Sequence, residues 1–320
     1  MLRVGVVGMH NHARRHTAAI RQMAGIRLMA VCDTNPDRLK ARAAEENVPG
    51  YTDLAEMIRQ ERLDALINVT GDAAHCATTV AALRAGVHVL CEKPLGLNLR
   101  EVRAMYRAAK QSGRLLFAGL NRRFAPAYVK FHELAAPFAG PGAVLYLEKF
   151  YGGFELPSRP AAQQGFVTGI HQADLAVWIG GRVKKIEGIS ATRQRAVDAQ
   201  GRRGYEARVC AVLTHAGGMR TFLTVGNRVV PVAEHPLNLE RTFFTTSAVY
   251  VDQYDFRRVT VSQGPCSRAF EFPEDQLGFL AQARAFVRAI QSGQAPYPPE
   301  SYLESHRVVF ALPREGTACP

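Results

Sequence analysis

The chain has 320 residues, 47% of them hydrophobic, which is enough for two domains of ordinary size with buried cores. It contains no run of about 18 apolar residues and no signal-peptide pattern at its start, so we expect a cytoplasmic protein without a membrane span. The net charge of +12 comes from arginines scattered over nearly every segment, which favours a solvated basic surface over a nucleic-acid partner. The six cysteines form no Cys-x-x-Cys pair, so neither a disulfide framework nor a zinc site built on cysteine pairs is expected.

Short apolar strands alternate with helices through the first 120 residues. The expected strands are 3–7, 26–32, 63–69, 88–91 and 115–119, with helical patterns between them. This alternation predicts an α/β domain over 1–120, with a parallel sheet covered on both faces in the Rossmann arrangement. Ligands of such a sheet bind at the carboxyl ends of the strands, near the point where the strand order reverses.

The pattern changes after residue 121. Long β-rich stretches are expected at 143–150, 184–192, 206–214, 219–225 and 241–251. Helical patterns cover 125–136, 168–179, 275–292 and 300–312. The segment Ala216-Gly217-Gly218 is typical of a hairpin turn between two of the strands. Residues 121–320 are therefore predicted to form an α+β domain built on a large, mainly antiparallel sheet.

A candidate dinucleotide site follows the first strand, in the segment Gly8-Met9-His10-Asn11-His12-Ala13. Gly8 and Ala13 fit the pattern G-x-G-x-x-G/A, but His10 replaces the middle glycine that lets the backbone approach a pyrophosphate. The strand-turn-helix setting still predicts a pyrophosphate at the helix N-terminus, next to His10, Asn11 and His12.

Asp33 ends the second strand, 20 residues after Ala13, where a carboxylate accepts hydrogen bonds from an adenosine ribose. Such a carboxylate repels a 2′-phosphate, so NAD is favoured as the cofactor. NADP stays open because Arg38 is close enough in sequence to pair with a 2′-phosphate. The alternative for Asp33 is a turn or helix-capping residue before Pro36.

Several segments together resemble the glucose–fructose oxidoreductase / inositol dehydrogenase (Gfo/Idh/MocA) family. Cys91-Glu92-Lys93-Pro94-Leu95 resembles its E-K-P motif. The other similar segments are Thr70 to His75 (T-P-x-x-x-H, with Gly71 for proline), Asn121-Arg122-Arg123-Phe124, His171-Gln172-Ala173-Asp174 (H-x-x-D) and His16 in the first helix.

The resemblance implies a Rossmann domain followed by a domain whose open sheet mediates oligomers, here a homodimer or homotetramer. It implies hydride transfer between NAD(P) and a carbinol or carbonyl of a sugar-like or polyol-like small molecule. Thr70, His75, Glu92 and Lys93 would then lie at the cofactor, and the Lys93–Pro94 bond would be cis.

Lys93 and His171 are the candidate catalytic residues. An ammonium at Lys93, just past a strand, would hydrogen-bond the reacting oxygen and stabilise its negative charge. His171 is a candidate acid/base, or alternatively a capping or core residue at the start of an apolar helical run. Asp174 follows one turn later and would orient His171 or bind a substrate hydroxyl.

Further polar residues are candidate substrate ligands: Arg122, Tyr151, Glu155 and Thr168. Arg122 has a simple alternative role in a surface ion pair. His10, His12, His16 and His75 lack a carboxylate at fitting spacing, so no metal site is predicted.

One position departs from the family pattern. Many members place an Asp four residues before the motif histidine, where this chain has Val167, a side chain that cannot titrate. The departure keeps two alternatives open: an enzyme that uses the nicotinamide transiently, for glycoside hydrolysis or internal redox, and a dinucleotide-binding sensor without turnover. Thr168 or Asp174 are the candidates to replace the missing carboxylate.

Overall fold

The computed structural model describes residues 1–152, 161–197, 201–228, 239–273 and 277–312. The chain forms two compact units, one from residues 1–121 with 278–299 and the other from 122–277 with 300–320. None of the helices within the described ranges is long and apolar enough to cross a membrane.

The first unit is built on a six-stranded parallel sheet in the order β3-β2-β1-β4-β5-β6. Its strands are β1 (Leu2–Val7), β2 (Ile26–Cys32), β3 (Gly50–Tyr51), β4 (Ala65–Asn68), β5 (His88–Glu92) and β6 (Leu116–Gly119). All their pairings are parallel, which confirms the predicted Rossmann arrangement. The strand order reverses between β1 and β4, so the carboxyl ends of these two strands mark the expected ligand position.

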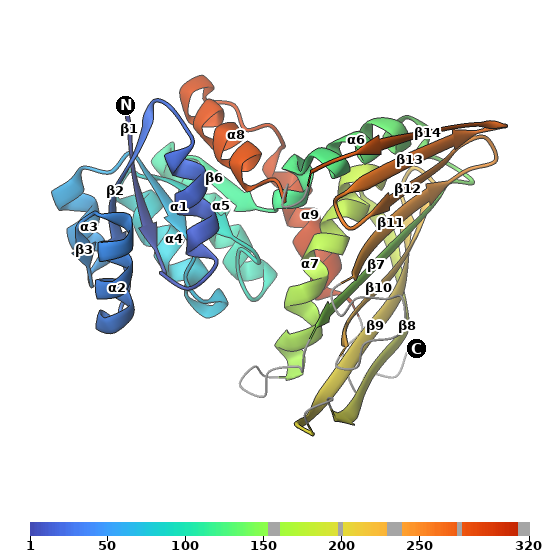
Figure 1. Cartoon of the computed structure of the whole chain (residues 1–320), viewed down its shortest axis with the longest axis horizontal. Helices are drawn as coiled ribbons and strands as arrows, with labels where there is room; N and C mark the ends of the chain where they lie inside the picture. Colours follow the sequence, from blue (N-terminus) through green and yellow to red (C-terminus); the bar gives the residue numbers. More distant parts are fainter. Residues whose placement is uncertain (153–160, 198–200, 229–238, 274–276, 313–320) are drawn as a thin grey trace. The chain divides into compact units, whose positions relative to one another are not determined.

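The helices of this unit are α1 (Ala13–Arg21), α2 (Pro36–Glu46), α3 (Leu54–Glu61), α4 (His75–Arg84), α5 (Leu99–Ser112) and α8 (Phe279–Ser292). Helix α1 packs against α8, while α3 and α5 each pack against α4 (Figure 1). Local capping explains where α5 begins: the Asn98 Oδ1 accepts the Glu101 N–H at 3.0 Å, and the Asn98 amide donates back to Glu101.

Helix α3 and strand β3 were not among the predicted elements. The local signal for α3 was present, because Asp53 caps the helix by accepting the backbone N–H of Glu56 at 2.7 Å. The helix has only eight residues, which is too short for its apolar periodicity to stand out.

Helix α8 groups with the first unit, whereas the sequence interpretation divided the chain once, between residues 120 and 121. The ring of Phe279 packs edge-on against His12 and His16 of the first unit, with centroids 5.9 and 5.2 Å apart. Gln282 donates from its amide to the Ala118 carbonyl of β6 at 3.2 Å. The chain thus returns to its first unit near residue 278, through contacts that no local pattern encodes.

The second unit contains an eight-stranded sheet in the order β14-β13-β12-β11-β7-β10-β9-β8. Its strands are β7 (Val144–Gly152), β8 (Val183–Val197), β9 (Arg203–His215), β10 (Arg220–Arg228), β11 (Leu239–Thr245), β12 (Tyr250–Tyr254), β13 (Arg258–Gln263) and β14 (Cys266–Glu271). The β7–β10 pair is parallel and the other pairs are antiparallel. The predicted mainly antiparallel sheet is therefore confirmed, as is the hairpin turn at 216–218 between β9 and β10.

Helices α6 (Pro126–Ala135), α7 (Ala161–Gly180) and α9 (Pro299–Phe310) lie on one face of this sheet (Figure 1). Helix α6 packs on β12 and β13, and α7 packs on β7, β9 and β10. Half-buried aromatic rings stack across neighbouring strands, with Tyr146 between Phe222 and Phe243 at centroid distances of 5.1 and 4.2 Å.

The stretch 241–251, predicted as one strand, belongs to two strands joined by a tight turn. The Thr246 hydroxyl accepts the backbone N–H groups of Ala248 and Val249, both at 3.1 Å, and this turn separates β11 from β12. A hydroxyl residue that bonds backbone two and three residues ahead competes with the strand ladder. Strands β13 and β14 were also not predicted.

Candidate functional site

Gly8 forms the turn between β1 and α1 in a backbone conformation that favours glycine. Its φ is +86°, and a Cβ at this position would lie 2.4 Å from the backbone nitrogen of Thr70. Gly8 also donates its N–H to the Cys32 carbonyl at the end of β2. The carboxyl ends of β1, β2 and β4 are therefore packed closely around this residue.

The three residues after Met9 are exposed at the N-terminus of α1: His10, Asn11 and His12. Within this described segment, α1 has no side-chain cap and no acidic residue in its first turn. The first N–H groups of a helix without such partners favour an anion, so the helix end suits a pyrophosphate. His10, which stands where the pattern has its middle glycine, is exposed.

Asp33, at the end of β2, has both carboxylate oxygens engaged. Oδ2 accepts the Met9 N–H at 2.7 Å and Oδ1 accepts the Asn35 N–H at 2.9 Å. Arg38 bridges the same two oxygens, each at 2.8 Å. Burial alone would raise the pKa of Asp33, but Arg38 and the two backbone donors lower it to about 2. Asp33 is thus an anion that organises the turn, in the place expected for a ribose ligand.

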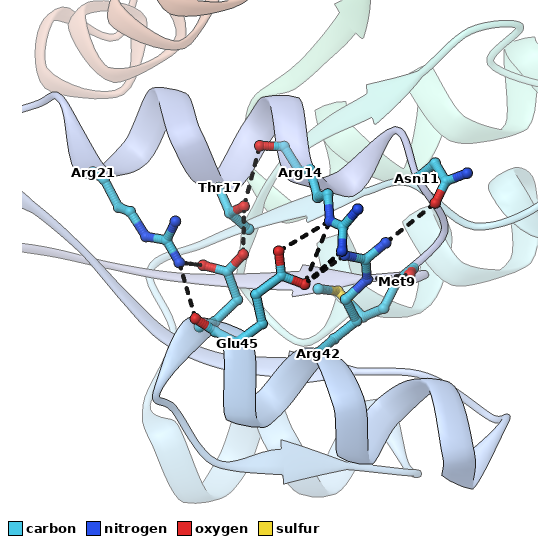
Figure 2. Close-up of polar contacts among 8 residues, drawn as sticks. Met9, Asn11, Arg14, Thr17, Arg21, Arg42 and Glu45 are labelled. Atoms are coloured by element: carbon cyan, nitrogen blue, oxygen red, sulfur yellow. Dashed lines mark hydrogen bonds and ion pairs between the residues drawn. The ribbon is translucent and has the colours of Figure 1, made fainter.

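A second arginine, Arg42, connects α2 to the glycine-containing turn (Figure 2). It donates to the Met9 carbonyl at 3.2 Å, to the Asn11 side chain at 3.3 Å and to Glu45 at 2.6 Å. Glu45 also accepts from Arg14 of α1 at 2.9 Å. Arg42 and Glu45 were not among the predicted site residues, although Arg38 and Arg42 are four residues apart and so share one face of α2.

The E-K-P turn begins at the buried Glu92, the last residue of β5. His16 of α1 contacts one oxygen of Glu92 at 2.8 Å, and the Lys93 N–H donates to the other at 3.0 Å. Burial favours a raised pKa for Glu92, but the His16 hydrogen bond and charge lower that pKa to about 2. The Lys93–Pro94 bond is cis, as predicted, and the Lys93 side chain is half-buried.

The loop after β4 is tied to the same turn through His75. The ring contacts the Pro94 carbonyl with Nδ1 at 2.6 Å and the Thr70 carbonyl with Nε2 at 2.9 Å. Because both partners are carbonyl oxygens, a neutral ring can donate to only one of them. The Thr70 hydroxyl donates to the fully buried Asn68 at 2.7 Å. Asn68 was not among the predicted site residues; its signal in the sequence is a polar residue at the end of a buried strand.

In the second unit, three side chains gather around Glu240 of β11. This carboxylate is 0% exposed. Arg122 donates to its two oxygens at 3.1 and 2.8 Å, Lys149 of β7 lies at 3.0 Å and the Tyr128 hydroxyl donates at 2.7 Å. Burial opposes the charge on Glu240, but Arg122 and Lys149 bring its pKa down to about 2. We call these four residues the Glu240 cluster.

His171 and Tyr151 lie next to this cluster. The Nε2 of His171, on α7, is 2.8 Å from a terminal nitrogen of Arg122. The Lys149 ammonium lies 4.9 Å from the centre of the Tyr151 ring. Burial raises the pKa of Tyr151 to about 12, although the charge of Arg122 acts in the opposite direction. The structure therefore brings together Arg122, Tyr151 and His171 of the predicted residues, around a carboxylate that the sequence interpretation did not identify.

Asp174 is engaged elsewhere in the second unit. Its carboxylate accepts two hydrogen bonds from Arg123, at 2.6 and 2.9 Å, and one from the Ser305 hydroxyl of α9 at 2.7 Å. Its contacts are those of a structural ion pair. The side chains of Val167 and Thr168, as well as Glu155, fall outside the described part of the structure.

Comparisons with known proteins find relatives of the first unit and of the whole chain. Residues 2–120 match the model of an oxidoreductase family with an NAD-binding Rossmann fold. A myo-inositol 2-dehydrogenase of Thermotoga maritima is 25% identical over 310 residues, which cover 92% of this chain and 90% of the relative. A 1,5-anhydro-D-fructose reductase of Ensifer adhaerens is 31% identical over 184 residues, 54% of this chain and 55% of that protein.

A solved structure extends the likeness to both units. It is the biliverdin reductase of Synechocystis sp. PCC 6803 in complex with biliverdin and NADP+. It superposes with a TM-score of 0.77 at 18% identity, covering 97% of each chain. At this identity the likeness concerns the fold.

Proposed function

We propose that this chain is an oxidoreductase of the Gfo/Idh/MocA family, whose model its residues 2–120 match, and that it transfers hydride between NAD(P) and a carbinol or carbonyl of a small sugar-like or polyol-like substrate. The observation that carries the proposal is the position of Lys93. It follows β5 on a turn that is held by Glu92 with His16 and by His75. Family relatives named as an inositol dehydrogenase and an anhydrofructose reductase support the substrate class.

In the proposed mechanism a bound nicotinamide supplies or accepts the hydride, and the chain handles the proton. When a carbonyl is reduced, its carbon gains the hydride and its oxygen takes a proton from the Lys93 ammonium. When a carbinol is oxidised, the same lysine as a free amine takes the hydroxyl proton. His171 of the second unit is the second proton-handling group, and Arg122, Tyr151 and Thr168 are proposed substrate ligands. Asp174 has no part in this mechanism because its carboxylate oxygens already accept hydrogen bonds from Arg123 and Ser305.

For the cofactor we propose NAD, with NADP also accepted. Asp33 is positioned for a ribose, but Arg38 already bridges its two oxygens. An incoming NAD ribose must compete with Arg38, whereas a 2′-phosphate would attract it. Arg42 and Arg14 add positive charge nearby, balanced in part by Glu45.

The decisive experiment replaces Lys93 with Met and measures turnover over a panel of polyols and keto-sugars with both cofactors. Loss of a general acid/base group lowers turnover by about 10²- to 10⁴-fold. NADH binding should stay within a few-fold of wild type, as measured by fluorescence titration. Lys110→Met, at an exposed lysine near the end of α5, is the matched control. Unchanged turnover in the Lys93 variant would remove the assignment.

Two alternatives keep specific support from Val167, which deprives the site of a family carboxylate. If this chain is an enzyme that uses the nicotinamide transiently, it would form product from a glycoside or an internal redox pair without net production of NADH. A sensor would bind the cofactor in calorimetry and turn over nothing in the panel. The same assays therefore separate the three functions.

We also propose that two or four copies associate through the sheet of the second unit, and that the protein is cytoplasmic. The stacked rings of Tyr146, Phe222 and Phe243 supply half-buried apolar surface for an interface. Light scattering tests the association, and a purely monomeric protein at micromolar concentration would refute it.

A further inference from the structure

The contact between Arg122 and His171 fixes which ring nitrogen carries a proton. The terminal nitrogen of Arg122 lies 2.8 Å from His171 Nε2. A guanidinium is protonated at any ordinary pH and has only donors. Nε2 must therefore accept, because an Nε2–H would point a second proton at the guanidinium over that distance. The neutral ring that meets this requirement carries its proton on Nδ1.

The guanidinium is itself held in place from the opposite side. The Glu240 carboxylate accepts hydrogen bonds from the Arg122 Nε at 3.1 Å and from the second terminal nitrogen of Arg122 at 2.8 Å. This two-point contact fixes the plane of the guanidinium. Glu240 is completely buried, and the Arg122 side chain is 12% exposed. Tyr128 and Lys149 occupy further positions around the same carboxylate. The position of Arg122 is thus set by Glu240.

The charges around the pair favour a neutral ring. Arg122 and Lys149 are cations, and Glu240 is the anion that contacts both. Asp255 is a further carboxylate near Lys149: burial raises the pKa of Asp255, and the charge of Lys149 acts in the opposite direction. On α7 itself, Asp174 is paired with Arg123. A protonated His171 would place a further positive charge at hydrogen-bond distance from the guanidinium.

We propose that Glu240 is a positioning residue that acts through Arg122 and holds His171 as the neutral Nδ1–H tautomer, with Nε2 as a hydrogen-bond acceptor. Its catalytic meaning rests on the proposed function. His171 in this state accepts and does not donate at Nε2, so the proton delivered to a reduced carbonyl comes from Lys93. The tautomer itself can be measured without any substrate.

The test uses the full chain labelled with ¹⁵N-histidine and long-range ¹H–¹⁵N correlation spectra at pH 7.5. The His171 signals are assigned by their absence in His171→Gln. The expected wild-type result is a protonated Nδ1 and an unprotonated Nε2. An Nε2–H tautomer or an imidazolium in the wild type would overturn the proposal, whether or not the chain proves to be an oxidoreductase.

Glu240→Gln and Arg122→Met test the positioning role. Both variants remove the two-point ion pair between Arg122 and Glu240, which we call the fork. We expect the single Nδ1–H pattern of His171 to be replaced by a mixture of tautomers. Glu304→Gln breaks a different Arg–Glu pair of the second unit, with Arg307, and should leave the His171 signals unchanged. If a variant does not fold by circular dichroism, Glu240→Asp replaces it, since a shorter carboxylate weakens the fork and should still broaden or shift those signals. A folded variant with an unaltered His171 tautomer refutes the role of Glu240.

Discussion

The Asp174 carboxylate accepts hydrogen bonds from two nitrogens of the Arg123 guanidinium, at 2.6 and 2.9 Å, and both side chains are buried. The guanidinium also lies over the Tyr302 ring, 4.6 Å from its centre, and Ser305 donates to the same carboxylate. The pair therefore links the segment after β6, helix α7 and helix α9 within the second unit.

Asp174→Asn should destabilise the protein. Removing one partner of a buried ion pair leaves the other charge uncompensated, at a cost of about 3–5 kcal/mol in the free energy of unfolding. Denaturant unfolding measures this loss. Ser305→Ala, which removes one hydrogen bond to the same carboxylate, should cost only about 1 kcal/mol. If Asp174→Asn instead keeps the stability of the wild type and has a raised KM, Asp174 is a substrate ligand.

Arg38→Ala should change the choice of cofactor. Loss of the guanidinium removes the partner of a 2′-phosphate, and we expect NADPH to bind about tenfold more weakly, equivalent to about 1.4 kcal/mol. NADH should bind equally well or more tightly, because Asp33 is released to accept ribose hydroxyls. Fluorescence titration of both cofactors measures the two constants, with the exposed Arg59→Ala as the control. If NADPH affinity stays the same, Arg38 has no role in recognising the phosphate.

Gly8→Ala should impair both stability and cofactor binding. The added Cβ would lie 2.4 Å from backbone of Thr70, a contact that no side-chain rotation relieves, and φ is +86°. We expect a loss of about 1–3 kcal/mol from the strained conformation alone. Gly25→Ala provides the comparison, since that glycine also has positive φ but meets nothing within 4 Å. Equal losses in the two variants would show that close packing at Gly8 contributes nothing.

His306 should make the protein less stable in mild acid. Burial lowers the pKa of His306 from 6.5 to about 4. Between these two pH values the unfolded chain therefore binds a proton at this histidine and the folded chain does not. Its contribution is complete above pH 6.5 and falls by about 3 kcal/mol as pH drops to 4, at about 1.4 kcal/mol for each pH unit. Burial lowers the pKa of three further histidines, which adds loss of the same sign: His88, His132 and His215.

Unfolding free energies measured between pH 7 and pH 4 check this expectation. His306→Asn keeps a side-chain amide near the Tyr302 carbonyl, which the ring contacts through Nδ1 at 2.7 Å, and should flatten the pH dependence. An equally steep slope in this variant would assign the acid sensitivity to other groups.

The sequence by itself determined the Rossmann strands and the E-K-P turn. Buried parallel strands need continuous apolar runs, and helices begin at caps such as Asn35 and Asn98, so these signals depend on neighbours a few residues apart. The turn residues around Gly8 and the cis Lys93–Pro94 bond followed from motifs of the same short range.

Only the tertiary structure decided which charges meet. Arg122 and Glu240 are separated by 118 residues, and nothing near either of them in the chain predicts the fork. The partners of Asp174 come from two distant segments, and α8 joins the first unit through Phe279 and Gln282. Such pairs depend on how the elements pack, because a buried charge is stable only when packing places an oppositely charged side chain next to it. Packing therefore sets the proposed role of His171, while the local sequence sets the position of Lys93.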